Sequence, residues 1–290
     1  MLTIMDYLYS QAAIKSNKFN IEAWYELMHG EADADIVVMG SSRAWVHIDP
    51  IIMDSIIDTS TYNLGIDGSP IDRQIRKYHV FRLHNRKPKM IIQNIDYASL
   101  GYRTGFNREQ FFPYLWDKTI RKEFLSSEHL TLFEKYVPMY RYYRNFDFET
   151  FKDVITNTER KLTRGYEGQE LHWDGTKFVE IKSITFSPND TTMQMFDQYL
   201  SDANAEGIKV VFVYTPMYIG ATKKLENIDE MYATYKKYAD RYDIPILDYT
   251  YMNICYDTTY FYNAMHLNKT GAEIFSDSLA HDIKKLGLLK

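Results

Sequence analysis

Short, continuous apolar runs alternate along this chain with longer segments in which apolar positions recur at helical spacing. Strands buried on both faces of a parallel sheet show such uninterrupted apolar runs. Strands that alternate with helices predict an α/β protein with a central parallel sheet between two helical layers. The predicted strands are residues 35–40, the first half of 61–70, 89–96, 209–216 and 244–248.

The helical periodicity is clearest near the carboxyl terminus of the chain. The last helix is predicted to begin near Lys269, with one apolar face made of Ala272, Phe275, Leu279, Ile283 and Leu286. Residues 249–265 before it are predicted to be a loop. The other predicted helices are residues 2–29, 51–57, a segment after Pro70, 192–204 and 225–242.

The change of pattern in the middle of the chain predicts an insertion. With 290 residues, one α/β domain with an insertion is favoured over two domains. We expect a helical lead-in over 1–30, the α/β domain over 31–99 and 189–290, and an aromatic-rich helical insertion over 100–188. An insertion at the carboxyl end of the third strand lies beside the ligand-binding edge, so it is either a lid or a structural, oligomer-forming elaboration.

Composition narrows the classes of protein. A net charge of -5 argues against a nucleic-acid partner, because such proteins carry a basic stripe. The single cysteine, Cys255, forms no intrachain disulfide, and the histidines show no metal-ligand spacing. We therefore predict neither a metal nor another cofactor.

The amino-terminal residues bear on the cellular compartment. They lack a basic start, and Asp6 interrupts their apolar run, so they make a poor signal peptide. No stretch has the apolar length of a transmembrane helix. The default expectation is a cytoplasmic protein, and an extracytoplasmic one if a leader has been removed. The oligomeric state stays open.

Candidate catalytic residues lie at the end of the first predicted strand and just before the last predicted helix. Gly40-Ser41-Ser42 ends the first predicted strand, at the edge where α/β proteins bind ligands, so Ser42 stands at a nucleophile's position; the alternative is a strand exit with a helix cap. His266 precedes the last helix at the same edge and could serve as the base that a serine needs, or it could only cap that helix. Arg43 is either a contact for an anionic substrate group or part of a structural ion pair.

Four blocks in this order resemble the SGNH/GDSL hydrolase superfamily. They are Gly40-Ser41-Ser42, the stretch Asn63 to Gly68, Gln93-Asn94-Ile95-Asp96, and Asn263-x-x-His266 followed by Leu-Asn-x-x-Gly-Ala. The resemblance implies a flavodoxin-like three-layer sandwich with Ser42 as nucleophile and His266 as base. It also implies an oxyanion hole made by the amides of Ser42 and Gly65 and by the side chain of Asn94.

The sequence departs from the superfamily pattern at two positions. Ser41 replaces the aspartate of the first block, and Asn263 replaces the acidic triad member. Replacing a triad aspartate by asparagine can cost about ten-thousandfold in turnover, although asparagine orients the histidine in papain-like sites. Asp248 or Asp257 could instead supply the carboxylate.

The resemblance implies hydrolysis or transfer of an acyl ester through a serine acyl-enzyme. Members of the superfamily act on acylated sugars, lipids or polysaccharides, and an acetyl ester of a carbohydrate suits the aromatic insertion. The alternative is a catalytically degenerate binding protein of a cell-surface polysaccharide system. A nucleotide-binding α/β protein is disfavoured, because no glycine-rich phosphate loop follows the first strand.

Overall fold

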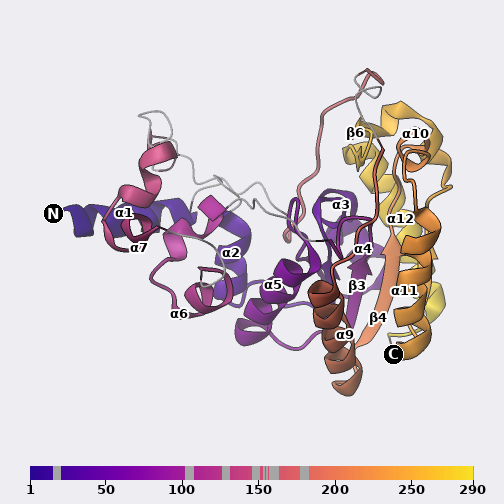
Figure 1. The fold of residues 1–290 in the computed structure, drawn as a ribbon, viewed down its shortest axis with the longest axis horizontal. Coiled ribbons are helices and arrows are strands. Elements are labelled where there is room, and N and C mark those ends of the chain that lie inside the picture. The colour runs from indigo at the N-terminus through magenta and orange to yellow at the C-terminus, as the bar shows by residue number, and fades with distance from the viewer. Residues whose placement is uncertain are drawn as a thin grey trace. The chain divides into compact units, whose positions relative to one another are not determined.

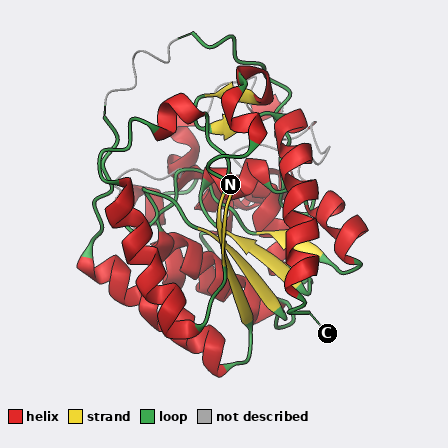
Figure 2. Cartoon of the chain, turned by 90° about the vertical axis from the view of Figure 1, so that its right-hand side faces the viewer, coloured by secondary structure: helices red, strands yellow, loops and turns green. Residues whose placement is uncertain are grey.

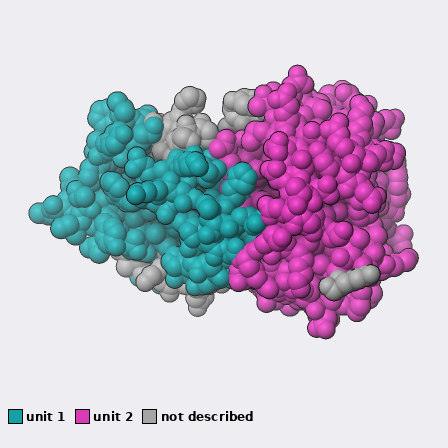
Figure 3. Space-filling model, turned by 90° about the horizontal axis from the view of Figure 1, so that it is seen from below, with its two compact units in different colours: residues 1–32, 79–85, 105–162 teal, residues 33–78, 86–104, 163–290 magenta. Residues whose placement is uncertain are grey.

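The computed structural model describes residues 1–15, 21–101, 108–125, 131–145, 151–152, 154, 156, 163–176 and 183–289. The chain divides into two compact units (Figure 3). Unit 1 consists of residues 1–32, 79–85 and 105–162, and unit 2 of residues 33–78, 86–104 and 163–290. The predicted lead-in thus shares a unit with most of the predicted insertion, whereas residues 163–188 of that insertion belong with the sheet.

Unit 2 is organised around a parallel sheet of five strands in the order β2-β1-β3-β4-β5, of which β3 and β4 are labelled in Figure 1. This result confirms the predicted sheet, and the order is the flavodoxin-like one. In register, Val37 of β1 lies between Tyr62 of β2 and Ile91 of β3. The strands are β1 (Ile36–Met39), β2 (Thr61–Asn63), β3 (Met90–Asn94), β4 (Lys209–Tyr214) and β5 (Ile246–Asp248).

Helices cover both faces of this sheet, so the predicted three-layer α/β/α sandwich is confirmed (Figure 2). One layer consists of α3 (Ser42–His47), α4 (Pro50–Ile57) and α12 (Lys269–Leu286). The other consists of residues 71–78 of α5 (Ile71–His84), α9 (Asp190–Ala205) and α11 (Ile228–Tyr242).

Alternation along the strands builds the two halves of the core. Val38 of β1 faces the layer that holds Phe275 of α12, and both side chains are fully buried. On the other face, Phe212 of β4 stacks against Phe196 of α9 and meets Tyr235 of α11. Each such large side chain contributes about 1.5–3 kcal/mol by its burial. Apolar packing on both faces therefore holds the strand ends that carry the site.

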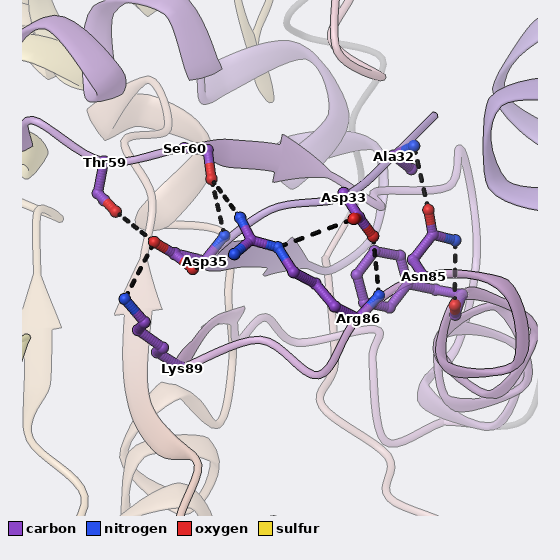
Figure 4. Close-up of polar contacts among 9 residues, drawn as sticks. Ala32, Asp33, Asp35, Thr59, Ser60, Asn85, Arg86 and Lys89 are labelled. Carbon is purple, nitrogen blue, oxygen red and sulfur yellow. Dashed lines mark hydrogen bonds and ion pairs between the residues drawn. The ribbon is translucent and has the colours of Figure 1, made fainter. Parts of the chain in front are cut away.

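An ion-pair network holds the opposite edge of the sheet, where the strands begin (Figure 4). Asp35, just before β1, accepts from Thr59 at 3.0 Å and pairs with Arg86 and Lys89, both at 3.2 Å. Burial acts to raise the pKa of Asp35, but these hydrogen bonds and charges hold that pKa below its usual value. The carboxylate therefore links the starts of three adjacent strands.

Unit 1 is helical and has an aromatic core. Trp24 packs against Phe111 and Phe124, and its indole N–H donates to Gln110 at 2.8 Å. Its elements, besides the end of α5, are α1 (Leu2–Lys15), α2 (Ile21–Met28), η1 (Arg108–Tyr114), α6 (Lys118–Ile120), η2 (Arg121–Leu125), α7 (Leu132–Tyr136) and η3 (Tyr140–Asn145). No helix in the described part of the chain is both long and apolar enough to cross a bilayer.

Two regions differ from the sequence prediction. The helical lead-in expected over 2–29 contains α1 and α2, the residues between them, 16–20, lie outside the described part, and the lead-in belongs to unit 1 and not to the sheet domain. The segment expected to be a loop contains a strand, which forms an antiparallel hairpin with the residues after it. Its strands are too short for any alternation of apolar residues to reveal them. The elements missed there and after β4 are α10 (Ile219–Thr222), η5 (Asn253–Tyr256), η6 (Thr258–Tyr260), β6 (Phe261–Asn263) and β7 (His266–Leu267).

Candidate active site

Ser42 occupies the first position of α3, three residues after Met39, where β1 ends. The carbonyl of Ser41 accepts the N–H groups of Ala44 and Trp45, both at 3.1 Å, and so starts the helix one residue beyond the strand exit. Gly40 is required at this exit, because a Cβ there would lie 2.5 Å from the Cβ of Ala44. The sharp turn presents Ser42 at the edge of the sheet.

His266 reaches the same edge on the short β6–β7 hairpin. Asn268, which follows the hairpin, caps α12 by accepting the N–H of Gly271 at 3.0 Å. The side-chain amide of Asn268 also donates to the carbonyl of Thr259 at 2.7 Å. These two bonds tie the hairpin to both the helix behind it and the turn before it, so His266 stands on a braced segment.

The structure brings Ser42, His266 and Asn263 into one line of hydrogen bonds. His266 Nε2 lies 2.8 Å from Ser42 Oγ, and His266 Nδ1 lies 2.9 Å from Asn263 Oδ1. Asn263 Oδ1 also accepts the N–H of Met265 at 2.9 Å, which identifies this atom as the amide oxygen. The proton of the neutral imidazole is therefore on Nδ1, and Nε2 is left to accept from Ser42.

The surroundings of His266 oppose its protonation. Burial lowers the pKa of His266, and the positive charge of Arg43 lowers it further, to about 4, although the carboxylate of Asp96 acts in the opposite direction. The ring of Tyr262 stacks on the imidazole with 5.3 Å between centroids. At neutral pH the histidine is thus in the neutral form that a general base needs, with a low affinity for the proton.

A second histidine, His47, supports the hairpin from α3. It is fully buried, and its Nε2 accepts the N–H of Leu267 at 3.0 Å. Its ring lies edge-on to that of His266, with 6.0 Å between centroids. Burial, together with the charges of His266 and Arg43, holds the pKa of His47 well below its usual value. Neutral His47 therefore holds in place the hairpin that carries His266, and it adds no positive charge next to His266.

Asp96 belongs to the third block of the sequence, but sequence reasoning gave it no role in the site. Its carboxylate accepts from Ser41 Oγ at 2.6 Å and from the N–H groups of Ala98 and Ser99, both at 2.8 Å. Asp96 is 2% exposed, so this carboxyl group is buried beside the turn that carries Ser42. The available signal was its place two residues after β3, at the same edge as Ser42.

The two other residues expected in the oxyanion hole have their hydrogen-bonding groups engaged elsewhere. The N–H of Gly65 donates to Asn63 Oδ1 at 2.9 Å, and a Cβ on Gly65 would lie 2.5 Å from the backbone nitrogen of Trp45. The side-chain amide of Asn94 donates to the carbonyl of Val213 at 3.2 Å. In this structure, the residue Gly65 allows a loop to approach α3 closely, and Asn94 links two strands.

Asn63 holds the second block against the nucleophile helix. Its side-chain amide donates to the carbonyl oxygens of Ala44 at 2.8 Å and Ile48 at 2.9 Å, near the end of α3. Because Asn63 is fully buried, these bonds are shielded from water. The block thus positions the helix that starts at Ser42.

The guanidinium of Arg43 is engaged at the end of β4, although Arg43 also lines the pocket over Ser42. Its guanidinium donates to Thr215 at 3.1 Å through both Oγ1 and the carbonyl, and it lies 4.5 Å from the ring centroid of Tyr214. No ion pair of Arg43 is found among the described residues. The expected ion pair is replaced by hydrogen bonds and a cation–π contact at the end of β4.

Neither alternative carboxylate is hydrogen-bonded to His266. Asp248 is exposed and accepts from the N–H of Thr250 at 2.9 Å. Asp257 is also exposed and accepts from the N–H of Thr259 at 2.9 Å, which caps η6 and lowers its pKa. Each of these two carboxylates accepts a backbone N–H two residues further along the chain. Asn263 is therefore the side chain that hydrogen-bonds to His266 Nδ1.

A small pocket opens over Ser42 and His266, with a volume of 160 Å³. Two carboxylates line it, those of Asp67 and Asp96. Over the residues that the structure describes, no three metal-binding side chains come together. The complete lining is Ser41, Ser42, Arg43, Asp67, Gly68, Ser69, Asp96, Tyr97, Ala98, Met265 and His266.

Comparison with known proteins gave no match to a family model or to a curated protein. Among solved structures, the chain is similar to a GDSL-like lipase from Bacteroides thetaiotaomicron, with 12% identity over 92% of this chain and 99% of that one and a TM-score of 0.42. A structure named for platelet activating factor, from Streptococcus pneumonia, has 11% identity over 97% and 98% of the two chains and a TM-score of 0.47.

A third similar structure is described as a candidate lipolytic protein of the G-D-S-L family, from Desulfitobacterium hafniense. It has 11% identity over 85% of this chain and 97% of that one, and a TM-score of 0.44. Two of these three structures, those from Bacteroides thetaiotaomicron and Desulfitobacterium hafniense, carry GDSL names. At these scores the likeness carries no argument about activity, which rests on the geometry of the site.

Proposed function

We propose that this chain is a serine hydrolase of the SGNH/GDSL type that cleaves a short acyl ester, such as an acetyl ester of a carbohydrate. The observation that carries the proposal is the continuous line from Ser42 Oγ through His266 to Asn263 Oδ1, with links of 2.8 and 2.9 Å. A nucleophile, a base and a group that orients the base are the parts that serine-based acyl transfer requires.

The reaction follows from the tautomer of His266. Ser42 Oγ attacks the ester carbonyl carbon while its proton passes to His266 Nε2. The same proton then goes to the leaving alcohol oxygen as the carbon–oxygen bond breaks, which leaves an acyl-Ser42 and a neutral imidazole. Water then attacks the acyl carbon while its proton passes to Nε2. The bond between that carbon and Ser42 Oγ breaks, Oγ takes the proton back from Nε2, and the acid is released. Asn263 Oδ1 keeps Nδ1 protonated throughout.

The oxyanion would be held first by the N–H of Ser42. Amides in the first turn of a helix have no intrahelical acceptor, and α3 begins at Ser42. Gly65 and Asn94 could join only by giving up their present bonds to Asn63 and Val213. In this proposal the Ser42 amide is therefore the principal donor.

The size of the pocket supports a short acyl group. Sites for drug-sized ligands occupy about 300–1,000 Å³, and the pocket here measures 160 Å³. Its serine and aspartate side chains suit a hydroxyl-rich leaving group better than an acyl chain of lipid length. An acetylated sugar meets both conditions.

A second candidate is a binding protein without turnover, as in a cell-surface polysaccharide system. The observation that favours it is the absence of a carboxylate at His266 Nδ1, where Asn263 stands, together with the lowering of the pKa of His266 to about 4. Such a histidine orients a ligand hydroxyl well but takes up a proton weakly.

The deciding experiment compares hydrolysis of p-nitrophenyl acetate by the wild type, Ser42→Ala and His266→Ala. We expect each variant to lose at least about a thousandfold in kcat/KM, because the nucleophile and base act as a unit. Ser55→Ala and His281→Ala remove the same groups from exposed positions and are expected to leave the rate unchanged.

A fluorophosphonate probe separates hydrolysis from binding alone. An activated Ser42 displaces fluoride, forms an oxygen–phosphorus bond and gains the mass of the phosphonyl group. Labelling of the wild type but not of Ser42→Ala supports the hydrolase. A wild type that neither reacts with the probe nor hydrolyses esters of several acyl lengths is a binding protein instead.

A further inference from the structure

A second pocket of unit 2 adjoins the pocket over Ser42. It has a volume of 360 Å³, and Tyr97 and Ala98 line both pockets. We call this second cavity the side pocket. Because the two pockets share lining residues, a ligand that reaches Ser42 with one end can occupy the side pocket with the other. The other residues that line the side pocket are Gly101, Thr185, Ser187, Pro188 and Asn189.

Two segments form the walls of the side pocket, and hydrogen bonds fix both of them. Residues 97–101 follow β3 at the carboxyl edge of the sheet, and residues 185–189 lead into α9. The N–H of Asn189 donates to the carbonyl of Leu100 at 2.8 Å and so joins the two segments. The side chain of Asn227 bonds both the N–H and the carbonyl of Phe186, each at 2.8 Å. These bonds give the side pocket fixed walls.

Tyr97 links the side pocket to the hairpin that carries His266. Its hydroxyl donates to Met265 Sδ at 3.2 Å, one residue before His266. Its half-buried ring is therefore held beside both pockets, and it offers an apolar face to a ligand that extends from one pocket to the other. Tyr97, Ile184 and Met265 also pack against one small apolar cluster, which consists of Met217, Ala221, Leu225 and Ala264.

The side chains that line the side pocket suit a neutral ligand with several hydroxyl groups. Ser187 is exposed, and Thr185 adds a second hydroxyl to the same wall. Asn189 Oδ1 accepts the N–H groups of Thr191 and Thr192 at 3.0 and 3.2 Å, so the NH₂ group of Asn189 remains as a donor to a ligand. Every described lining residue is uncharged, so a phosphate or carboxylate group would lose hydration there without gaining an opposite charge.

We propose that the side pocket binds the sugar of a carbohydrate ester whose acyl group lies over Ser42. The inference rests on the proposed function for the class of substrate, and it adds the site that selects this class. The pocket over Ser42 measures 160 Å³ and the side pocket 360 Å³. Only the side pocket lies within the range of about 300–1,000 Å³ that is usual for a small-molecule site. The sugar therefore crosses the ring of Tyr97, and Ser187 and Asn189 bind its hydroxyl groups.

The test compares two acetate esters that differ in their alcohol. Ethyl acetate is small enough for the pocket over Ser42 alone, whereas mono-O-acetyl-xylotriose also reaches the side pocket. Ser187→Trp fills the side pocket, so the ratio of kcat/KM for the trisaccharide ester to that for ethyl acetate should fall at least about tenfold, through KM. Ser187→Ala keeps the pocket open and removes one hydroxyl, so this ratio should fall about threefold. The matched control is Ser55→Trp at an exposed position of α4, which should keep the ratio of the wild type.

Calorimetric binding to Ser42→Ala separates the side pocket from the proposed hydrolysis. Ser42→Ala should bind mono-O-acetyl-xylotriose, and Ser42→Ala/Ser187→Trp should bind it at least about tenfold more weakly. If the wild type hydrolyses neither ester, this difference in affinity still supports the side pocket and overturns the hydrolase. If the wild type hydrolyses ethyl acetate but the two variants bind the trisaccharide ester equally, or not at all, the side pocket is overturned and the hydrolase stands. A ratio of kcat/KM that Ser187→Trp leaves unchanged also overturns the side pocket.

Discussion

Helices α12 and α1 use similar apolar spacing in opposite ways. In α12 of unit 2, the stripe that includes Phe275 and Leu279 is fully buried against the sheet. In α1 of unit 1, the stripe that includes Ile4 and Leu8 is exposed, and Asp6 is the residue at 0% exposure. The same pattern therefore marks the core in one unit and an outer face in the other. Periodicity identifies a helix, and its partners decide which side is covered.

The difference predicts different sources of stability. Unit 2 is held by apolar area removed from water, which responds little to the loss of any one polar contact. The position of α1 in unit 1 depends on a buried ion pair, and removal of one partner leaves the other charged and buried. Substitutions on the two helices should separate these cases.

The largest expected effect is from Phe275→Ala on α12. Removal of a fully buried aromatic ring should lower the free energy of unfolding of unit 2 by about 3–5 kcal/mol. Leu8→Ala, at an apolar position of α1, should change the stability of unit 1 by no more than about 0.5 kcal/mol. Urea unfolding of both variants measures the contrast. Equal losses would show that the apolar side of α1 that carries Ile4 and Leu8 is covered within the folded chain.

The next effect is from Asp6→Ala, which leaves the guanidinium of Arg141 buried without its carboxylate. We expect unit 1 to lose about 3 kcal/mol, measured by denaturant unfolding. The double variant Asp6→Leu/Arg141→Met replaces the pair by apolar side chains and should stay within about 1 kcal/mol of the wild type. A single variant as stable as the wild type would show that the ion pair does not anchor α1.

The smallest expected effect is from Asn263→Asp, which changes how the rate of hydrolysis depends on pH. Protonated His266 cannot accept the proton of Ser42, so hydrolysis should be lost as the pH falls through the pKa of His266, about 4. In Asn263→Asp a carboxylate accepts Nδ1–H and should raise this pKa by about 1–2 units. The acid limb of kcat/KM should move to higher pH by the same amount, and the plateau should rise about tenfold.

The control for this prediction is Asp248→Asn, which removes an exposed carboxylate that has no hydrogen bond to His266. Its pH profile should overlay that of the wild type. An acid limb that stays in place in Asn263→Asp would mean that a group other than His266 controls the reaction.

The apolar runs along the sequence were sufficient to predict the strands whose ends carry the site. Each apolar run that predicted a strand became one, and the rule that ligands bind at the carboxyl edge placed Ser42 and His266 together. The pattern did not reveal the role of Asp96, whose contact with Ser41 joins the ends of two strands. It also missed the hairpin that carries His266, because strands of two or three residues show no usable alternation.

The sequence by itself determined the five strands and the longer helices between them, because apolar periodicity is a local property that survives without knowledge of partners. It also placed Ser42 and His266 at one edge of the sheet. Tertiary structure alone decided that Asn263 orients His266, that Gly65 is engaged by Asn63, and that α1 turns its apolar stripe outward. Each of these depends on which polar atoms come within hydrogen-bond distance, and packing of the whole chain sets those distances.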